Sequence, residues 1–313
     1  MLDEPAPGLK TPHAALKGGV FALGNFDGVH RGHQSVLAAT VQAALSRGTP
    51  ARVLTFEPHP RSVFKPNQPP FRLTPAPAKE RLLREFGASD VILHPFNLEL
   101  SRLSAREFVE DILVGTYGIQ HAVAGFDFVF GHDRGGNMKS LQAWLEPHKI
   151  GVTEVPPFKD FHGQIISSSR TRTALQKGDL RTVHNILGRA WSIAGLVEHG
   201  AKRGRTIGVP TANINLGEYQ RPKYGVYAVK AGPVGQPASQ HGVANIGIRP
   251  TVDGQTEVLE VHLFDFDDTI YDQAWEVTLL DFIRPEKAFP DIETLRRQIA
   301  QDMASAKALL KAL

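Results

Sequence analysis

The sequence predicts an α/β protein whose first domain is a doubly wound parallel sheet and whose second domain is a small antiparallel barrel or sandwich. The chain has 313 residues, whereas one compact core usually takes about 100–200 residues, which favours two domains. Strand-like and helix-like segments alternate before residue 186, as in βαβ units. After it, strand-like segments follow one another directly. We therefore expect domains at residues 1–185 and 186–313.

The first half begins with a short apolar strand at residues 20–24 that ends in a glycine. A helix follows, because apolar residues recur at helical spacing until Gly48: Val36, Leu37, Val41, Ala44 and Leu45. Further strands are expected at 51–56, 91–93 and 122–124, with a helical pattern at 105–113 and a proline-rich loop at 65–77.

In the second half, strands are expected at 191–198, 224–230, 242–246, 258–264 and 275–282, with almost no helix between them. One terminal helix closes the chain, and Asp291 is its expected N-cap. Its apolar stripe is formed by Ile292, Leu295, Ile299, Met303 and Leu310.

Composition excludes several classes of protein. The 35 Lys and Arg residues nearly balance 32 Asp and Glu, and a net charge of +3 is no nucleic-acid footprint. The chain has no cysteine, which excludes disulfide frameworks, thiolate nucleophiles and cysteine-ligated metal centres. No apolar run approaches the roughly 20 residues of a membrane span, and the N-terminus lacks secretory features. We expect a soluble cytoplasmic protein without nucleic-acid or membrane partners.

The first chemical motif, residues 24–33, lies between the first strand and the first helix, where open α/β sheets bind ligands. The helix start offers free N–H groups to a phosphate, and His30 and His33 add hydrogen-bond donors. Three glycines let the backbone approach closely: Gly24, Gly28 and Gly32. The alternative is a turn with incidental histidines or a surface metal pair. The order of strand, glycines and helix favours the phosphate site.

A second motif begins a helix-like segment near residue 168. The hydroxyls of Ser168 and Ser169 beside Arg172 are typical of a phosphate clamp. Alone, such a serine-rich stretch is more typical of a simple helix cap. Together with the upstream histidines, it indicates a nucleotide site.

The second half has a basic, glycine-rich loop followed by a compact polar motif. The arginine side chains and backbone amides of this loop are suited to bind phosphate oxygens, and its residues are Arg203, Gly204, Arg205 and Gly208. Thr211 and Asn213 supply the hard oxygen atoms that Mg²⁺ prefers, although a tight turn with a cap fits them equally well. Glu260 lies on the polar face of an alternating strand, where it can accept a proton from a hydroxyl or simply face solvent.

These motifs resemble known families. His-x-Gly-His with Ser-Ser-x-x-x-Arg resembles the nucleotidylyltransferase superfamily. Residues 26–33, 55–60 and 125–131 resemble the FMN adenylyltransferase module of bacterial bifunctional riboflavin kinase/FAD synthetases. The resemblance implies a Rossmann-like nucleotidylyltransferase domain, with catalysis by His30, His33 and Arg172. It further implies an ATP site that includes Phe26 and Asp27, flavin contacts at Phe56, Pro58, Pro60 and Phe64, and a substrate or cofactor contact at Asp127. Thr171 stands where that family more often has an aliphatic residue.

The second half resembles riboflavin kinases at residues 208–213, 224–227, 244–247 and 259–262, in the same order. The resemblance implies a riboflavin kinase-like barrel in which Thr211 and Asn213 bind Mg²⁺ with the nucleotide. It also implies that Glu260 activates the ribityl 5′-hydroxyl of riboflavin.

The expected function is therefore bifunctional flavin cofactor synthesis. Riboflavin and ATP would give FMN, and FMN with a second ATP would give FAD and pyrophosphate, in a monomer or transient homo-oligomer. Two alternatives stay open at this point. One is a nucleotidylyltransferase for another phosphorylated acceptor, such as phosphopantetheine or nicotinamide mononucleotide. The other is a flavin-binding regulator that lacks catalysis, since fold does not fix function.

Overall fold

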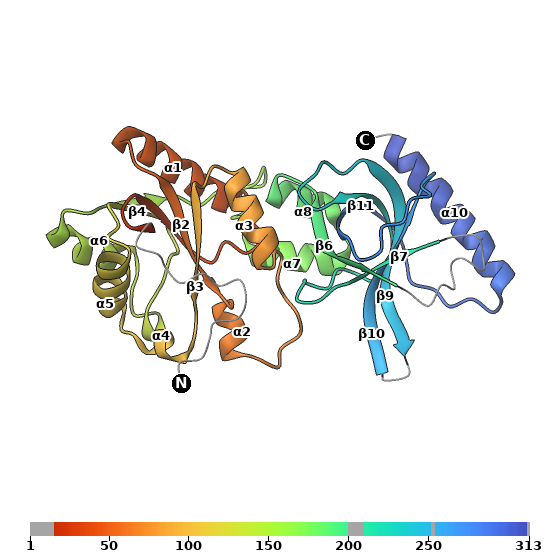
Figure 1. Ribbon diagram of the computed structural model, residues 1–313, viewed down its shortest axis with the longest axis horizontal. Coiled ribbons are helices and arrows are strands. Elements are labelled where there is room, and N and C mark those ends of the chain that lie inside the picture. The colour runs from red at the N-terminus through yellow and green to blue at the C-terminus, as the bar shows by residue number, and fades with distance from the viewer. Residues whose placement is uncertain (1–15, 200–209, 252–253, 312–313) are drawn as a thin grey trace. The chain divides into compact units, whose positions relative to one another are not determined.

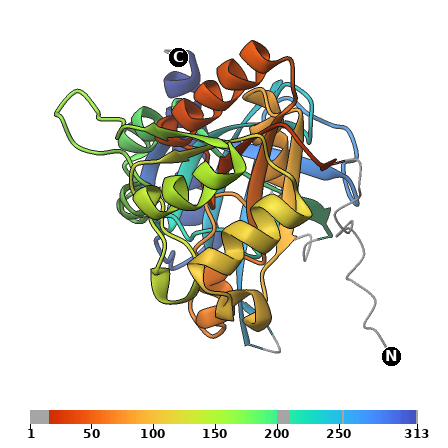
Figure 2. The same cartoon turned by 90° about the vertical axis from the view of Figure 1, so that its left-hand side faces the viewer.

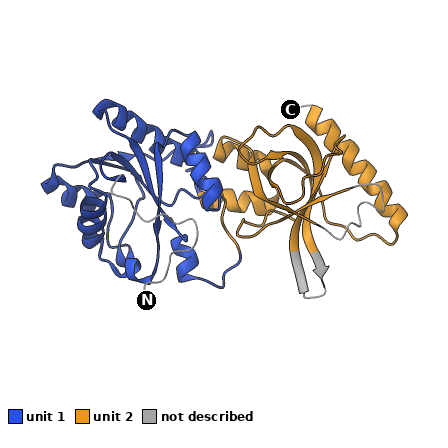
Figure 3. Ribbon diagram, viewed as in Figure 1, with its two compact units in different colours: residues 1–69, 74–167 blue, residues 70–73, 168–313 orange. Residues whose placement is uncertain are grey.

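The computed structural model describes residues 16–199, 210–251 and 254–311, and the chain divides into two compact units (Figure 3). Unit 1 comprises residues 1–69 and 74–167, and unit 2 comprises residues 70–73 and 168–313. The segment 70–73 belongs to unit 2 because the Arg72 amide donates to the Glu218 carbonyl at 3.1 Å. Helices α7 (Ser168–Lys177) and α8 (Leu180–Leu187) also pack in unit 2. The functional boundary at residue 185 stays a prediction.

Unit 1 contains a five-stranded sheet in the order β3-β2-β1-β4-β5, in which every pair is parallel. The strands are β1 Val20–Leu23, β2 Ala51–Glu57, β3 Asp90–Pro95, β4 His121–Gly125 and β5 Gly151–Val155. The order reverses between β1 and β4, which opens a crevice beyond the carboxyl ends of these strands. The predicted doubly wound parallel sheet is confirmed.

Successive side chains of β1 point to opposite faces of the sheet, so both faces carry apolar residues. Helices cover both faces. Val20 and Ala22 pack with α1 (Arg31–Arg47) and α3 (Ala76–Glu85). Phe21 and Leu23 pack on the other face with the helices that Figure 2 shows in front of the sheet: α5 Ala105–Glu107, η2 Phe108–Thr116 and α6 Met138–Leu145. Short helices fill the connections: α2 Pro60–Phe64, α4 Leu98–Arg102, η3 His132–Arg134 and η4 Glu146–His148.

Several elements of unit 1 have no counterpart in the sequence expectations, helix α3 and strand β5 among them. Helix α3 begins inside the segment 65–77, which was expected to be a loop because of its prolines. Proline is nevertheless tolerated in the first turn of a helix. Strand β5 is short and mostly not buried, so its apolar signal is weak. By contrast, α1 ends as expected, with Gly48 in the left-handed conformation at φ 63°.

Unit 2 is built around a closed antiparallel barrel in the order β10-β7-β6-β11-β8-β9 (Figure 1). The strands are β6 Trp191–Glu198, β7 Ala212–Asn215, β8 Gly225–Pro233, β9 Gln240–Thr251, β10 Gly254–Leu263 and β11 Ala274–Pro285. Buried side chains from alternate positions fill the interior, Ile214, Ile246 and Leu259 among them. The structure therefore selects the barrel over the sandwich. Strand β7 was not expected, because the motif 208–213 was interpreted as a nucleotide and Mg²⁺ site or a tight turn rather than as a strand.

Helix α10 (Ile292–Lys311) packs against the barrel. The Asp291 carboxylate accepts from the Thr294 amide at 2.7 Å, which confirms the predicted cap. Met303 and Leu310 pack as expected, in a hydrophobic cluster that joins α10 to Val226, Ala228 and Val243 of the barrel strands. The expectation for Ile292 is wrong: it is 61% exposed, whereas the α10 residues that join the hydrophobic cluster with the barrel strands lie later in the helix, from Met303 to Leu310.

Candidate active sites

The loop after β1 has a backbone conformation that residues other than glycine rarely adopt. Phe26 and Val29 have φ values of 51° and 42°, and Gly28 has φ 88°. Buried hydrogen bonds fix this shape: Asp27 Oδ1 accepts from the Thr74 amide at 3.0 Å, and Thr74 Oγ1 accepts from the Gly28 amide at 2.9 Å. Asp27, expected at the nucleotide, is 2% exposed and stabilises the loop. Such local strain persists only where surrounding contacts over-determine it, as at ligand sites.

The two histidines of this loop lie together at the start of α1. His30 is the N-cap, and its Nδ1 accepts from the His33 amide at 3.2 Å. The two rings stack with centroids 3.6 Å apart, and Phe26 contacts His33 edge-on at 5.2 Å. A side chain at Gly32 would lie 3.2 Å from the His30 ring, so glycine keeps the stack compact. The two imidazole rings therefore lie at the N-terminus of α1, where free backbone N–H groups and the helix dipole stabilise an anion.

Sheet register brings the predicted flavin and phosphate segments to the same edge. Leu23, the last residue of β1, pairs with Leu54 in β2 and Ala124 in β4. The loop that contains Gly24 therefore lies between the end of β2, which contains Phe56, and the end of β4, which leads to Asp127. Asp127 is exposed. This is the crevice where open α/β sheets bind ligands.

Aromatic side chains form a wall at the end of β2. Phe56 contacts Phe96 and Phe108 with centroids 5.6 and 6.1 Å apart, and Phe64 contacts Phe96 at 5.7 Å. Phe64 is 59% exposed, so an apolar ring remains open to solvent. Pro58 is exposed and Pro60 begins α2. Sequence reasoning missed Phe96, although its position just after a parallel strand was a usable signal.

A partly buried polar pair supports this wall. His94 Nδ1 and the Tyr117 hydroxyl form a 2.7 Å hydrogen bond, and the His94 ring meets Phe56 edge-on. Burial lowers the pKa of His94 and raises the pKa of Tyr117 to about 12. Both side chains are therefore uncharged at neutral pH.

The predicted phosphate clamp at residues 168–172 begins α7 in unit 2. Arg172 Nε donates to the Phe71 carbonyl at 2.8 Å, and its guanidinium lies 5.4 Å from the centre of the Phe71 ring. Segment 70–73 thus orients this arginine. The roles of Ser168, Ser169 and Arg172 toward ATP stay predictions.

In the barrel, Glu260 pairs directly with Asn213 on β7 and with Asn245 on β9. The alternation of the strands places these three residues on the face opposite Leu259, which fills the barrel core. Asn213 is 4% exposed, and its Oδ1 has no hydrogen-bond partner within the described part of the chain. A buried, unsatisfied amide oxygen needs a ligand. An oxygen of this type fits Mg²⁺, and Thr211 lies two residues away.

Other polar contacts made by residues of β10 were missed by sequence reasoning. His262 Nδ1 donates to the Pro210 carbonyl at 2.8 Å, which holds the chain just before Thr211. Glu257 accepts from Arg221 Nε at 2.7 Å and from the Tyr224 hydroxyl. Burial, together with Glu257, raises the pKa of Tyr224 to about 12. The expected loop residues Arg203, Gly204, Arg205 and Gly208 lie outside the described residues.

Comparison with known proteins covers both units. The FAD synthetase family model matches residues 13–170, and the riboflavin kinase family model matches residues 187–310. A bifunctional riboflavin kinase/FMN adenylyltransferase of Pseudomonas fluorescens is 41% identical over 303 residues, 96% of each chain. Its Bacillus subtilis (strain 168) counterpart is 40% identical over 304 residues, 94% of this chain and 95% of the relative.

A solved structure supports the fold. It is described as a macrolide-efflux protein from Streptococcus pneumoniae, is 32% identical, covers 94% of both chains and has a TM-score of 0.80. Within residues 16–199, 210–251 and 254–311 of the present chain, no helix has the length and apolar character needed to cross a membrane.

Proposed function

The chain belongs to the bifunctional riboflavin kinase/FMN adenylyltransferases, and on that premise we propose which of its residues carry each reaction. Its substrates are riboflavin, FMN and ATP. We assign the adenylyl transfer to residues 1–185 and the kinase reaction to residues 186–313. The observation that carries the proposal is the clustering of candidate groups at two separate places, the carboxyl edge of the parallel sheet and the β7–β10 ladder of the barrel.

In the kinase reaction, Glu260 acts as the general base. Its carboxylate accepts the proton of the ribityl 5′-hydroxyl while that oxygen attacks the γ-phosphorus of ATP, and ADP leaves. Directly opposite residues of an antiparallel ladder have Cβ atoms about 5 Å apart, so Asn213 lies beside the base. Asn213 and Thr211 would hold Mg²⁺, which neutralises phosphate charge when bound.

In adenylyl transfer, a phosphate oxygen of FMN attacks the α-phosphorus of ATP and pyrophosphate leaves. The phosphate is already ionised at neutral pH, so the protein need not remove a proton. His30, His33 and the N-terminus of α1 stabilise the charge on the phosphates, and Arg172 with Ser168 and Ser169 complete the ATP site. The wall that contains Phe56 and Phe64 receives the flavin ring, and Asp127 contacts substrate.

The test is product analysis of a His30→Ala variant supplied with riboflavin, ATP and Mg²⁺. We expect FMN to accumulate while FAD formation falls by about 10²-fold or more, because phosphate stabilisation is lost. His148→Ala is the matched control, since His148 lies elsewhere in unit 1, where its Nε2 lies 2.7 Å from Glu110 Oε2. Wild-type FAD formation by His30→Ala would refute the assignment.

A further inference from the structure

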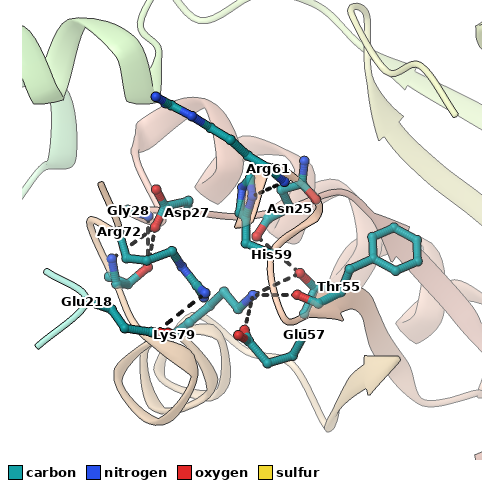
Figure 4. A network of polar contacts seen from close by, with 12 residues as sticks. Asn25, Asp27, Gly28, Thr55, Glu57, His59, Arg61, Arg72, Lys79 and Glu218 are labelled. Carbon is teal, nitrogen blue, oxygen red and sulfur yellow. Dashed lines mark hydrogen bonds and ion pairs between the residues drawn. The ribbon is translucent and has the colours of Figure 1, made fainter. Parts of the chain in front are cut away.

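Lys79 is a lysine of α3 whose side chain is completely buried in unit 1. Lysine is almost never fully buried unless its ammonium group is paired. Here Nζ donates to Thr55 Oγ1 at 3.2 Å and to the Phe56 carbonyl at 3.4 Å, and it lies 3.6 Å from Glu57 Oε2 (Figure 4). One ammonium group thus contacts three consecutive residues at the carboxyl end of β2.

The contact extends to the neighbouring loop through Thr55. An ammonium group can only donate, so Thr55 Oγ1 accepts from Lys79 and is left to donate its own proton. That proton goes to the Asn25 carbonyl, 3.1 Å away. Asn25 lies in the loop that leads to His30. A directed chain of two hydrogen bonds therefore runs from Lys79 to the loop after β1.

We propose that Lys79 is a positioning residue for adenylyl transfer. The inference rests on the proposed function, in which the end of β2 receives the flavin and the loop after β1 holds the ATP phosphates. Lys79 fixes these two segments to each other. The FMN phosphate must meet the α-phosphorus of ATP closely, and a misplacement of about 1 Å can cost about 10²-fold in rate.

Arg52 provides a matched comparison at the amino end of the same strand, β2. This buried cation of β2 lies 3.0 Å from Asp90 Oδ2, and its Nη1 donates to the Lys17 and Gly18 carbonyls at 2.7 Å each. Like Lys79, it is buried and contacts one carboxylate and backbone carbonyl oxygens. Because it lies at the amino end of the strand, its described contacts, with Lys17, Gly18 and Asp90, lie away from both substrate segments.

The experiment compares Lys79→Met with Arg52→Met in the full chain. In each variant, kcat and KM for FMN and ATP are measured during FAD formation, and riboflavin phosphorylation by the same sample reports folded enzyme. We expect Lys79→Met to lower kcat/KM for FMN adenylylation by about 10²-fold with kinase turnover unchanged. Arg52→Met should change it by less than about threefold. Equal losses in both variants would overturn the proposal.

Two further variants separate positioning from a buried unpaired charge. Lys79→Met leaves Glu57 without this partner, so we combine it with Glu57→Gln, which neutralises the carboxylate. The double variant should stay impaired, and recovery to near wild-type rates would overturn the proposal. Thr55→Val removes the link to Asn25 with little change in shape and should also slow adenylylation, whereas Thr55→Ser should preserve it. These variants also test the proposal if Lys79→Met does not fold.

Failure of the proposed function can be recognised separately. If His30→Ala keeps wild-type FAD formation, the site assignment itself is wrong. If His30→Ala loses FAD formation while Lys79→Met and Thr55→Val retain it, only the role of Lys79 is refuted.

Discussion

Glu260 on β10 lies directly opposite Asn213 on β7, in a continuous antiparallel ladder of a closed barrel. The same glutamate lies opposite Asn245 on β9, whose side-chain nitrogen donates to Glu286 Oε1 at 3.4 Å. The proposed base and the proposed Mg²⁺ ligand therefore sit on adjoining rigid strands. A ladder fixes such a pair more accurately than loops can.

The first prediction concerns the base. Glu260→Gln keeps the size of the side chain but cannot accept the hydroxyl proton, so riboflavin phosphorylation should fall by about 10²–10⁴-fold. Adenylylation of supplied FMN should stay unchanged, because we assign that reaction to residues 1–185, which do not include Glu260. Separate assays with riboflavin and with FMN check both expectations. Unchanged kinase turnover would exclude Glu260 as the base.

The second prediction concerns the unsatisfied oxygen of Asn213. Asn213→Ala should raise the Mg²⁺ concentration needed for half-maximal kinase activity by at least about tenfold, since it removes a ligand oxygen. A Mg²⁺ titration of FMN formation measures the effect. Asn215→Ala is the control, because Asn215 is exposed on the same strand and accepts from the Gly217 amide. Equal Mg²⁺ requirements in both variants would contradict the assignment.

The third prediction concerns the pH dependence of stability. Burial lowers the pKa of His94 in the folded state, whereas the pKa of an unfolded histidine is about 6.5. Below that pH the unfolded chain binds a proton that folded His94 does not, so the unfolding temperature should fall as the pH decreases, and His94 should have no effect above it. In His94→Gln, the decrease between about pH 7 and 5.5 should be smaller. Thermal unfolding at both pH values tests this, and an equal decrease in both proteins would refute it.

Most of the fold could be predicted because its signals are local. Apolar runs ending in glycine or proline located β1, β2 and β6 within about one residue, and Gly48 marked the end of α1. Strand β7 was missed because only four residues pair, and Asn213, one of its two buried side chains, is polar. Its partners on β6 and β10 lie far away in sequence, which a local pattern does not report.

Of the candidate site residues, those in short sequence motifs could be predicted, whereas those that depend on tertiary packing could not. The resemblance identified the stacked histidines and the opposed Glu260 and Asn213, because their residue types sit in short motifs. Lys79 was missed, because a lysine in a helix is ordinarily read as a solvated side chain. Only the packing of α3 beside the end of β2 shows that its ammonium group is buried. Phe96 was missed for a related reason, since its contacts with Phe56 and Phe64 depend on strand order.

The most direct test of the central claim, that FMN is made at one site and consumed at another, is a mixing experiment. His30→Ala and Glu260→Gln are each incubated with riboflavin, ATP and Mg²⁺, alone and together, and the flavins are separated by chromatography. We predict that His30→Ala accumulates FMN, that Glu260→Gln leaves most riboflavin unchanged, and that the mixture forms FAD rapidly, as released FMN passes to the intact adenylylation site. FAD formation at the wild-type rate by either variant alone, or no gain in FAD from mixing, would contradict the account.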